Sequence, residues 1–301
     1  MTLQIRKAED GDIPKLMSLF NAHVTPHKSA DTFRWWNSFP SIMFCAEVEN
    51  EIVGTFLVLK RKLNNNLNCG VIMGLIIKPE WRGKGLFKKL GVEAMDYFED
   101  IDLFCCLPNI AGKRALELNF GFKTIETINT MTRSSNSPSE CQCYTRSLIT
   151  TSTEFNNFVS DKKDTVMFLA DEEFRRWRFA THHRYSYEVV FMDTGEFAVI
   201  NKYYNVETDV RYGDIVDFES KELEENRLMK LFYCASAGLR EDVDDLTIQA
   251  VPNTLLSKVA KKMGFVDSNV KHHFCIKVKE SKNDYLYYPS NWLIKWGDYL
   301  R

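Results

Sequence analysis

Basic side chains and glycines gather at one place in the chain, between an apolar run and an amphipathic run. Residues 77–90 hold Gly83, Gly85 and five basic side chains against the single Glu80, so this stretch has a net charge of +4 in a chain whose total is -2. Glycines let a ligand approach the backbone, and a helix that begins after them presents free N–H groups and the positive end of its dipole. We interpret this turn as a phosphate-binding site.

Two regular elements must hold the turn in place. Residues 70–77 are apolar and rich in branched side chains, as in a buried strand, and Pro79 prevents their continuation. Leu86, Leu90 and Ala94 then recur at helical spacing. We therefore predict a strand, a turn and a helix in this order.

The turn differs from two common nucleotide-binding motifs. Gly85 is not followed by Lys-Ser or Lys-Thr, which excludes a nucleoside-triphosphate P-loop, and a third glycine with a downstream acidic residue, as in dinucleotide-binding turns, is missing. The pattern resembles the acyl-CoA pyrophosphate loop of the GNAT family of N-acetyltransferases, Gln/Arg-x-x-Gly-x-Gly/Ala. Arg82 and Gly85 occupy its first two fixed positions, whereas Phe87 replaces the last small residue.

The resemblance implies which residues bind acyl-CoA. In the family, the strand before the loop separates from its neighbour and its exposed backbone binds the pantetheine arm. A second strand, an Asn at the following helix start and a closing Gly-Phe complete the site, and here these are residues 101–107, Asn109 and Gly121-Phe122. Asn109 suits a simple helix cap equally well. The implied cofactor-binding residues are Leu75, Ile76, Ile77, Arg82, Gly83, Lys84, Gly85, Leu86, Phe87 and Asn109.

The rest of the first 130 residues fits the same α/β fold, a central mixed sheet flanked by helices. Alternating or apolar runs predict strands at residues 2–6, 43–48 and 52–60, the last two joined by the polar turn Glu49-Asn50-Glu51. An amphipathic helix is expected after Asp12, and a further one over 109–120.

The length of 301 residues predicts two domains. The polar stretch 133–143 is the best linker, although a long hairpin loop is an alternative. Landmarks then repeat, because the segment at 31–36, Asp-Thr-Phe-Arg-Trp-Trp, is echoed by Glu-Glu-Phe-Arg-Arg-Trp at 172–177, and Leu-Pro-Asn at 107–109 by Val-Pro-Asn at 251–253. We predict tandem GNAT-like domains at 1–140 and 141–301.

The second copy lacks the glycine-rich turn. Where the repeat places it, residues 217–226 contain no glycine and carry five acidic side chains against Lys221, a net charge of -4. Such a cluster repels a pyrophosphate. We therefore predict one acyl-CoA site, in the first domain.

The resemblance implies direct transfer of an acyl group, expected to be acetyl from acetyl-CoA, to a primary amine in a ternary complex. The usual catalytic groups are not found, because Glu117 stands where the family often has a Tyr that protonates the thiolate, and Val71 falls near the position of a base. The catalytic residues therefore stay unassigned. Remaining candidates are His23, His27, Asp31, Glu47 and the aromatic and basic segment 175–187.

The acceptor is predicted by analogy to be an amino sugar, either free or linked to a nucleotide. His27, Arg184 and Tyr185 are the candidate acceptor-binding residues, and the acceptor is expected between the two domains. The alternative enzyme function is acylation of a small amine, peptide or antibiotic. Two further hypotheses are a module that senses acyl-CoA without consuming it and an enzyme that transfers aminoacyl groups from tRNA.

Composition limits the other classes. With 45% hydrophobic and 27% charged residues, no signal-peptide run and no apolar stretch of about 20 residues, we expect a soluble cytoplasmic protein with no membrane partner. The pI near 6.3 argues against a nucleic-acid partner. Cys45, Cys105, Cys106 and Cys275 lie in apolar runs, the pair Cys141 and Cys143 has poor spacing for a metal, and we predict no metal site. The oligomeric state stays open.

Overall fold

The computed structural model describes residues 2–24, 27–39, 41–135, 144–155, 158 and 165–298. The chain forms two compact units, and each is built from two separate segments. The first unit is Met1–Ile125 with His273–Tyr287, and the second is Glu126–His272 with Tyr288–Arg301. The sequence predicted a domain boundary between residues 140 and 141. This position lies in the stretch 136–143, outside the described residues.

The first unit contains a mixed sheet. Neighbouring strands from β1 to β4 are antiparallel, β5 is parallel to β4, and the last part of β13 pairs antiparallel with β5. The strands are β1 (Leu3–Lys7), β2 (Ser41–Val48), β3 (Glu51–Lys62), β4 (Asn68–Ile77), β5 (Leu103–Cys106) and β13 (Val266–Val278). The strands predicted at 43–48, 52–60 and 70–77 are therefore present, each slightly longer than the sequence pattern.

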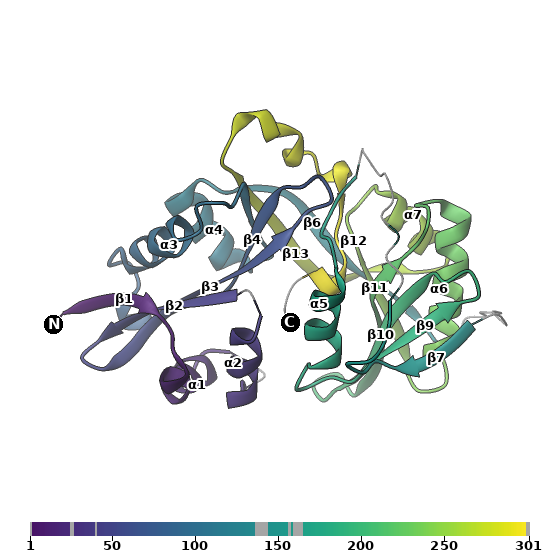
Figure 1. The fold of residues 1–301 in the computed structure, drawn as a ribbon, viewed down its shortest axis with the longest axis horizontal. Helices are drawn as coiled ribbons and strands as arrows, with labels where there is room; N and C mark the ends of the chain where they lie inside the picture. Colours follow the sequence, from purple (N-terminus) through teal and green to yellow (C-terminus); the bar gives the residue numbers. More distant parts are fainter. Residues whose placement is uncertain are drawn as a thin grey trace. The chain divides into compact units, whose positions relative to one another are not determined.

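Helices cover both faces of this sheet (Figure 1). Because side chains alternate along a strand, Phe56 and Val58 face α3, where they pack in one core with Leu90 and Ala94. On the other face, Phe20 of α1 reaches β4. The helices are α1 (Ile13–Asn21), α2 (Ala30–Asn37), α3 (Leu86–Asp96) and α4 (Ile110–Phe120), with short 3-10 turns η1 (Asp10–Asp12), η2 (Pro79–Trp81) and η4 (Ser281–Tyr287).

The second unit has its own mixed sheet. Its strands follow the order β6, β12, β11, β10, β9, β7, in which β11 and β12 are parallel and the other neighbours antiparallel. Their bounds are β6 (Lys123–Ser134), β7 (Tyr144–Leu148), β9 (Tyr187–Met192), β10 (Phe197–Asn205), β11 (Val210–Glu219) and β12 (Asp245–Ala250). A two-stranded parallel pair adds β8 (Val166–Met167) and β14 (Trp292–Leu293).

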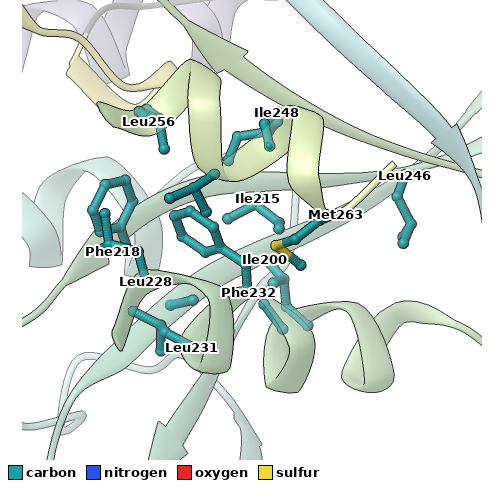
Figure 2. Packing of buried hydrophobic residues seen from close by; sticks show 14 of the residues in the cluster. Ile200, Ile215, Phe218, Leu228, Leu231, Phe232, Leu246, Ile248, Leu256 and Met263 are labelled. Atoms are coloured by element: carbon teal, nitrogen blue, oxygen red, sulfur yellow. The ribbon is translucent and has the colours of Figure 1, made fainter. Parts of the chain in front are cut away.

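One face of this sheet carries the core of the second unit. Figure 2 shows Phe218 and Phe232 among the apolar residues that α6, α7 and the strands bring together, with ring centroids 5.0 Å apart. The other face packs against a π-helical turn, where Phe179 meets Val199 and Val216. The remaining elements are α5 (Glu172–Arg175), the π-helical turn η3 (Arg176–Ala180), α6 (Glu225–Leu239), α7 (Leu255–Lys262), η5 (Pro289–Asn291) and η6 (Trp296–Asp298).

The order of elements in the first unit recurs in the second. The series α2-β2-β3-β4-α3-β5-α4 is followed by α5-β9-β10-β11-α6-β12-α7. In both series a glycine with positive φ follows the last helix, Gly121 at 70° after α4 and Gly264 at 85° after α7. The predicted mixed α/β fold with a repeated order of elements is confirmed.

The strands that follow α4 and α7 join the unit of the other copy. β6 follows α4 in sequence, yet Met131 of β6 pairs with Ile248 of β12. Likewise, β13 follows α7, yet Cys275 of β13 pairs with Cys106 of β5. The sequence repeat alone did not predict this exchange.

Candidate functional site

Strand β4 separates from β5 before it reaches its end. The two strands pair only from Cys69 to Val71 of β4, which then continues to Ile77. The register with β3 shifts because β4 carries an extra residue at a bulge, where Gly74 adopts a φ of 59° and its carbonyl accepts a 2.7 Å hydrogen bond from Thr55 Oγ1. Residues 75–77 therefore extend beyond the ladder with β5, as the family resemblance predicts for the strand that binds pantetheine.

The glycine loop, residues 82–85, lies between η2 and α3 and is open. Gly83 and Gly85 have φ angles of 71° and 76°, and a Cβ added to either would meet nothing within 4 Å. No side chain caps α3, and no acceptor for the backbone N–H groups of residues 83–87 is found in the described part of the chain. Unpaired donors at a helix start, beside the exposed Arg82 and Lys84, are the features that favour anion binding in proteins.

Phe87 departs from the family pattern because its ring belongs to the core. Its centroid lies 5.4 Å from that of Phe120 and 6.2 Å from that of Phe56. Gly91, one turn later, makes the necessary room, since a Cβ there would stand 2.3 Å from Phe120 Cζ. Leu86 is buried, so it can serve a ligand through its backbone alone, whereas Phe87 is half-buried against the core.

Asn109 caps helix α4. Its Oδ1 accepts a 2.8 Å hydrogen bond from the N–H of Gly112, which confirms the capping interpretation. Its contact with acyl-CoA stays a prediction.

Glu117 lies in a small hydrogen-bonded group of the first unit. Thr124 Oγ1 donates to its Oε1 at 2.7 Å, and Lys113 Nζ lies 3.8 Å away. The same hydroxyl is 3.2 Å from Cys275 Sγ. The hydrogen bond with Cys106 lowers the pKa of the Cys275 thiol, although burial raises it. No local pattern in the sequence indicates this group, because Cys275 lies far from Glu117 along the chain.

The other acidic candidates are engaged in ion pairs. Glu47 binds Arg6 and Lys15, each at 2.7 Å, and these hydrogen bonds lower the pKa of its carboxyl. Asp31 binds the adjacent Arg34 at 2.7 Å on the surface. His23 and His27 are exposed. None of these observations assigns a catalytic base.

The predicted acceptor segment 175–187 is partly interior. Arg175, Trp177 and Tyr187 are at most 5% exposed, and Arg175 forms a 2.8 Å ion pair with Glu219. They are therefore core residues.

Arg184 and Tyr185 lie at the surface of the second unit. The Arg184 guanidinium stands 5.2 Å from the ring of Tyr185, which stacks on His182 at 5.1 Å. His182 Nδ1 accepts the backbone N–H of both residues, at 3.2 and 3.1 Å, and so fixes the turn. His27 belongs to the first unit, so a shared acceptor site stays a prediction.

Five free cysteines are described, Cys45, Cys69, Cys105, Cys106 and Cys275, and all are buried. Cys141 and Cys143 lie outside the described residues. Cys234 is disulfide-bonded, a bond uncommon in a reducing compartment, so the expected cytoplasmic location stays a prediction. Among the described residues, no group of three or more His, Cys, Asp or Glu side chains could hold a metal ion. Within the same residues, no helix has the length and apolar character needed to cross a membrane.

Comparison with known proteins identifies the fold and the class of the first unit. Residues 12–122 match the model of the acetyltransferase (GNAT) family. No curated protein matches the sequence. The structure is similar to a GCN5-related N-acetyltransferase from Anabaena variabilis, with a TM-score of 0.68, 11% identity and coverage of 92% of this chain and 73% of that one.

Two further solved structures share the fold. A tandem GNAT protein from the clavulanic acid biosynthesis pathway aligns with a TM-score of 0.60 and 12% identity over 92% of this chain and 98% of that one. N-myristoyltransferase from Saccharomyces cerevisiae, with bound myristoyl-CoA, gives 0.62 and 11% over 91% and 82%. Residues 12–122 therefore form a domain of the acetyltransferase (GNAT) family, which supports an acyl-CoA-dependent acyltransferase in general terms, and the solved structures support the fold.

Proposed function

We propose that this protein transfers the acetyl group of acetyl-CoA directly to a primary amine in a ternary complex. The observation that carries the proposal is the glycine loop, in which two positive-φ glycines leave open space beside unpaired N–H groups. A diphosphate needs several donors and positive charge, and this loop offers both.

The path of the cosubstrate follows from the strand that leads to the loop. With the diphosphate at residues 82–87, the pantetheine arm lies along residues 75–77 of β4, where the strand has left β5. The thioester then lies near the bulge at Gly74. The amine nitrogen forms a bond to the acyl carbon, the carbon–sulfur bond breaks, and the ammonium proton must pass to a base or water while the CoA thiolate is protonated.

For the acceptor, we propose an amino sugar, either free or linked to a nucleotide. The support is the family resemblance together with the exposed guanidinium and half-buried ring of Arg184 and Tyr185, which suit a phosphate and a base or sugar face. A small amine, peptide or antibiotic is the alternative acceptor. An acyl-CoA sensor is the second candidate function, because Glu117, held by Thr124, stands where the family often has a catalytic Tyr.

Calorimetry with Gly85→Glu tests the cosubstrate site. The new carboxylate enters the glycine loop, so we expect affinity for acetyl-CoA to fall by about tenfold or more. Gly264→Glu is the matched control, since Gly264 also has positive φ and open space around its Cβ position but lies in the second unit. Equal binding by wild type and Gly85→Glu, or binding by neither, contradicts the proposal.

Turnover separates the enzyme from the sensor. Release of CoA thiol from acetyl-CoA should rise when amino sugars and other primary amines are supplied, and each acceptor should gain one acetyl group by mass spectrometry. Tight binding without thiol release for any amine favours the sensor instead.

A further inference from the structure

The second unit contains a buried carboxylate, that of Glu196, whose side chain lies against the turn between β11 and α6. Glu196 is 1% exposed and precedes β10. Its Oε1 accepts from Ser220 Oγ at 2.6 Å and from the N–H of Lys221 at 3.1 Å, while Oε2 accepts from Thr194 Oγ1 at 2.8 Å. Arg227 Nη1 stands 3.4 Å from both oxygens. Four donors from the turn, from α6 and from the preceding hairpin therefore converge on one anion.

This place corresponds to the glycine loop of the first unit. At the end of β4, Ile77 pairs with Gly54 of β3, and at the end of β11, Glu219 pairs with Phe197 of β10. Gly54 and Phe197 therefore correspond, and so do the residues that precede them in sequence, Val53 and Glu196. In the first unit, the donors of the turn are left unpaired. In the second, Glu196 fills the equivalent turn from inside the protein.

The end of β11 is occupied as well. β11 pairs with β12 only as far as Ile215 and then runs on to Glu219, as β4 outruns β5. Lys295 Nζ donates to the carbonyl of Phe218 at 3.2 Å and forms an ion pair with Asp217. A Cβ added to Gly297 would stand 3.3 Å from the carbonyl oxygen of Val216. The C-terminal segment thus covers the stretch that corresponds to the pantetheine-binding residues of β4.

Glu196 is held as a carboxylate. Burial raises the pKa of its carboxyl, but hydrogen bonds from Ser220, Thr194 and the Lys221 backbone, together with Arg227, bring that pKa below its usual value. A buried charge is retained only when donors replace its water, and here they do.

We propose that the turn between β11 and α6 is a retained oxyanion site whose occupant is the side chain of Glu196. The ligand class that fits it is a small oxyanion, carboxylate or phosphate. In the native chain the site is filled intramolecularly, so it has no room for an external phosphate, and this holds whether or not the first unit transfers acyl groups.

Glu196→Ala tests the site because it removes the occupant and leaves the donors. Thermal unfolding of the whole chain is measured in sodium chloride, sodium acetate and inorganic phosphate at matched ionic strength. We expect the Tm of Glu196→Ala to fall in chloride and, relative to the wild type in the same salt, to rise saturably with acetate or phosphate. Acetate acting alone identifies a carboxylate-sized site, and phosphate acting as well identifies a wider one.

Three matched variants make the result specific. Glu196→Gln keeps the site filled by an amide, so it should lose stability without saturable rescue. Glu196→Ala combined with Arg227→Ala should need about tenfold more anion for half the gain. Glu207→Ala, at an exposed acidic residue, should behave as wild type.

Three outcomes contradict the proposal. Chloride raises the Tm of Glu196→Ala as much as acetate and phosphate do, the Tm of Glu196→Gln rises equally, or Glu196→Ala fails to fold in all three salts. Acetyl-CoA titration of the wild type gives an independent check, since the filled site predicts one molecule bound per chain. A second equivalent molecule would also overturn it.

Discussion

Arg82 Nε donates a 3.0 Å hydrogen bond to the backbone carbonyl of Ile77, the last residue of β4. The bond spans the η2 turn and links the glycine loop to the strand that precedes it. A guanidinium has five N–H donors, so about four stay available for a ligand. Arg82 thus sets the position of the loop relative to β4 and offers charge at the same time.

Replacement of Arg82 separates these two roles. We expect Arg82→Ala to weaken acetyl-CoA binding by about tenfold, and Arg82→Lys to recover only part of it, because lysine keeps the charge but lacks the planar fork. Calorimetry measures both, with the exposed Lys89→Ala on α3 as the control for loss of one positive charge. Full recovery by Arg82→Lys would show that the bond to Ile77 has no part in binding.

Gly91 should be intolerant of a side chain although it lies inside a helix. A Cβ there would stand 2.3 Å from Phe120 Cζ and 2.9 Å from Phe56 Cε2, so overpacking should outweigh the gain in helix propensity. We expect Gly91→Ala to lower the free energy of unfolding by about 1–3 kcal/mol in urea titrations.

Two companions test that reason. Gly11→Ala, whose Cβ would meet nothing within 4 Å, should change the unfolding free energy little. Phe120→Leu should reduce the cost of Gly91→Ala when the two are combined. If the losses of unfolding free energy from Gly91→Ala and Phe120→Leu are additive, the contact with Phe120 is not the source of the strain.

Acid should weaken the first unit through its partly buried ion pairs. Arg6 binds Asp12 at 2.6 Å and Glu47 at 2.7 Å. The pKa of Asp12 is lowered, mainly by the hydrogen bond from Arg6, and that of Glu47 by bonds from Lys15 and then Arg6. Because the folded-state pKa values are depressed, the stabilisation is present above the ordinary carboxyl pKa of about 4 and is lost as the pH falls further.

The measurement compares wild type with Arg6→Gln in urea at several pH values from about 6 down to about 3. The unfolding free energy of wild type should fall more steeply over the acid part of this range. Parallel curves would mean that Arg6 does not control these two carboxyls.

If the proposed acetyl transfer holds, Arg184 and Tyr185 should affect the acceptor alone. Changing both to Ala is expected to raise the acceptor KM by about tenfold, from loss of a charged donor and a stacking face, with acetyl-CoA affinity nearly unchanged. Steady-state kinetics and calorimetry report these separately. Arg176→Ala is the control, since this exposed arginine pairs with Glu172 next to the segment. Unaltered kinetics for a confirmed acceptor would remove Arg184 and Tyr185 from the site.

Local patterns predicted the elements that hold the glycine loop. The branched run before Pro79 became β4, the apolar spacing after Gly85 became α3, and Asn109 became a cap, because each outcome depends on residues within one or two turns. Gly74 also carried a local signal, since a glycine inside a strand often marks a bulge. The charge of residues 217–226 predicts that this turn differs from the glycine loop.

Long-range partners left no such trace. Glu196 is one acidic residue among many in sequence, and only its contacts with Ser220 and Lys221 show what it does. Phe87 was a mismatch with the family pattern until Gly91 and Phe120 explained it. The pairing of Cys275 with Cys106 depends on residues far apart, for which hydrophobic patterning gives no register.

That last pairing has a consequence for synthesis on the ribosome. Cys106 and Cys275 are 169 residues apart, so at about 5–20 residues per second the partner strand of β5 emerges roughly 8–34 s after β5 itself. Until then one side of β5 is an unpaired edge, the kind of surface through which nascent chains associate. The first copy is completed only by β13, which follows the second copy, and a stop codon placed after the first copy would release an unfinished sheet.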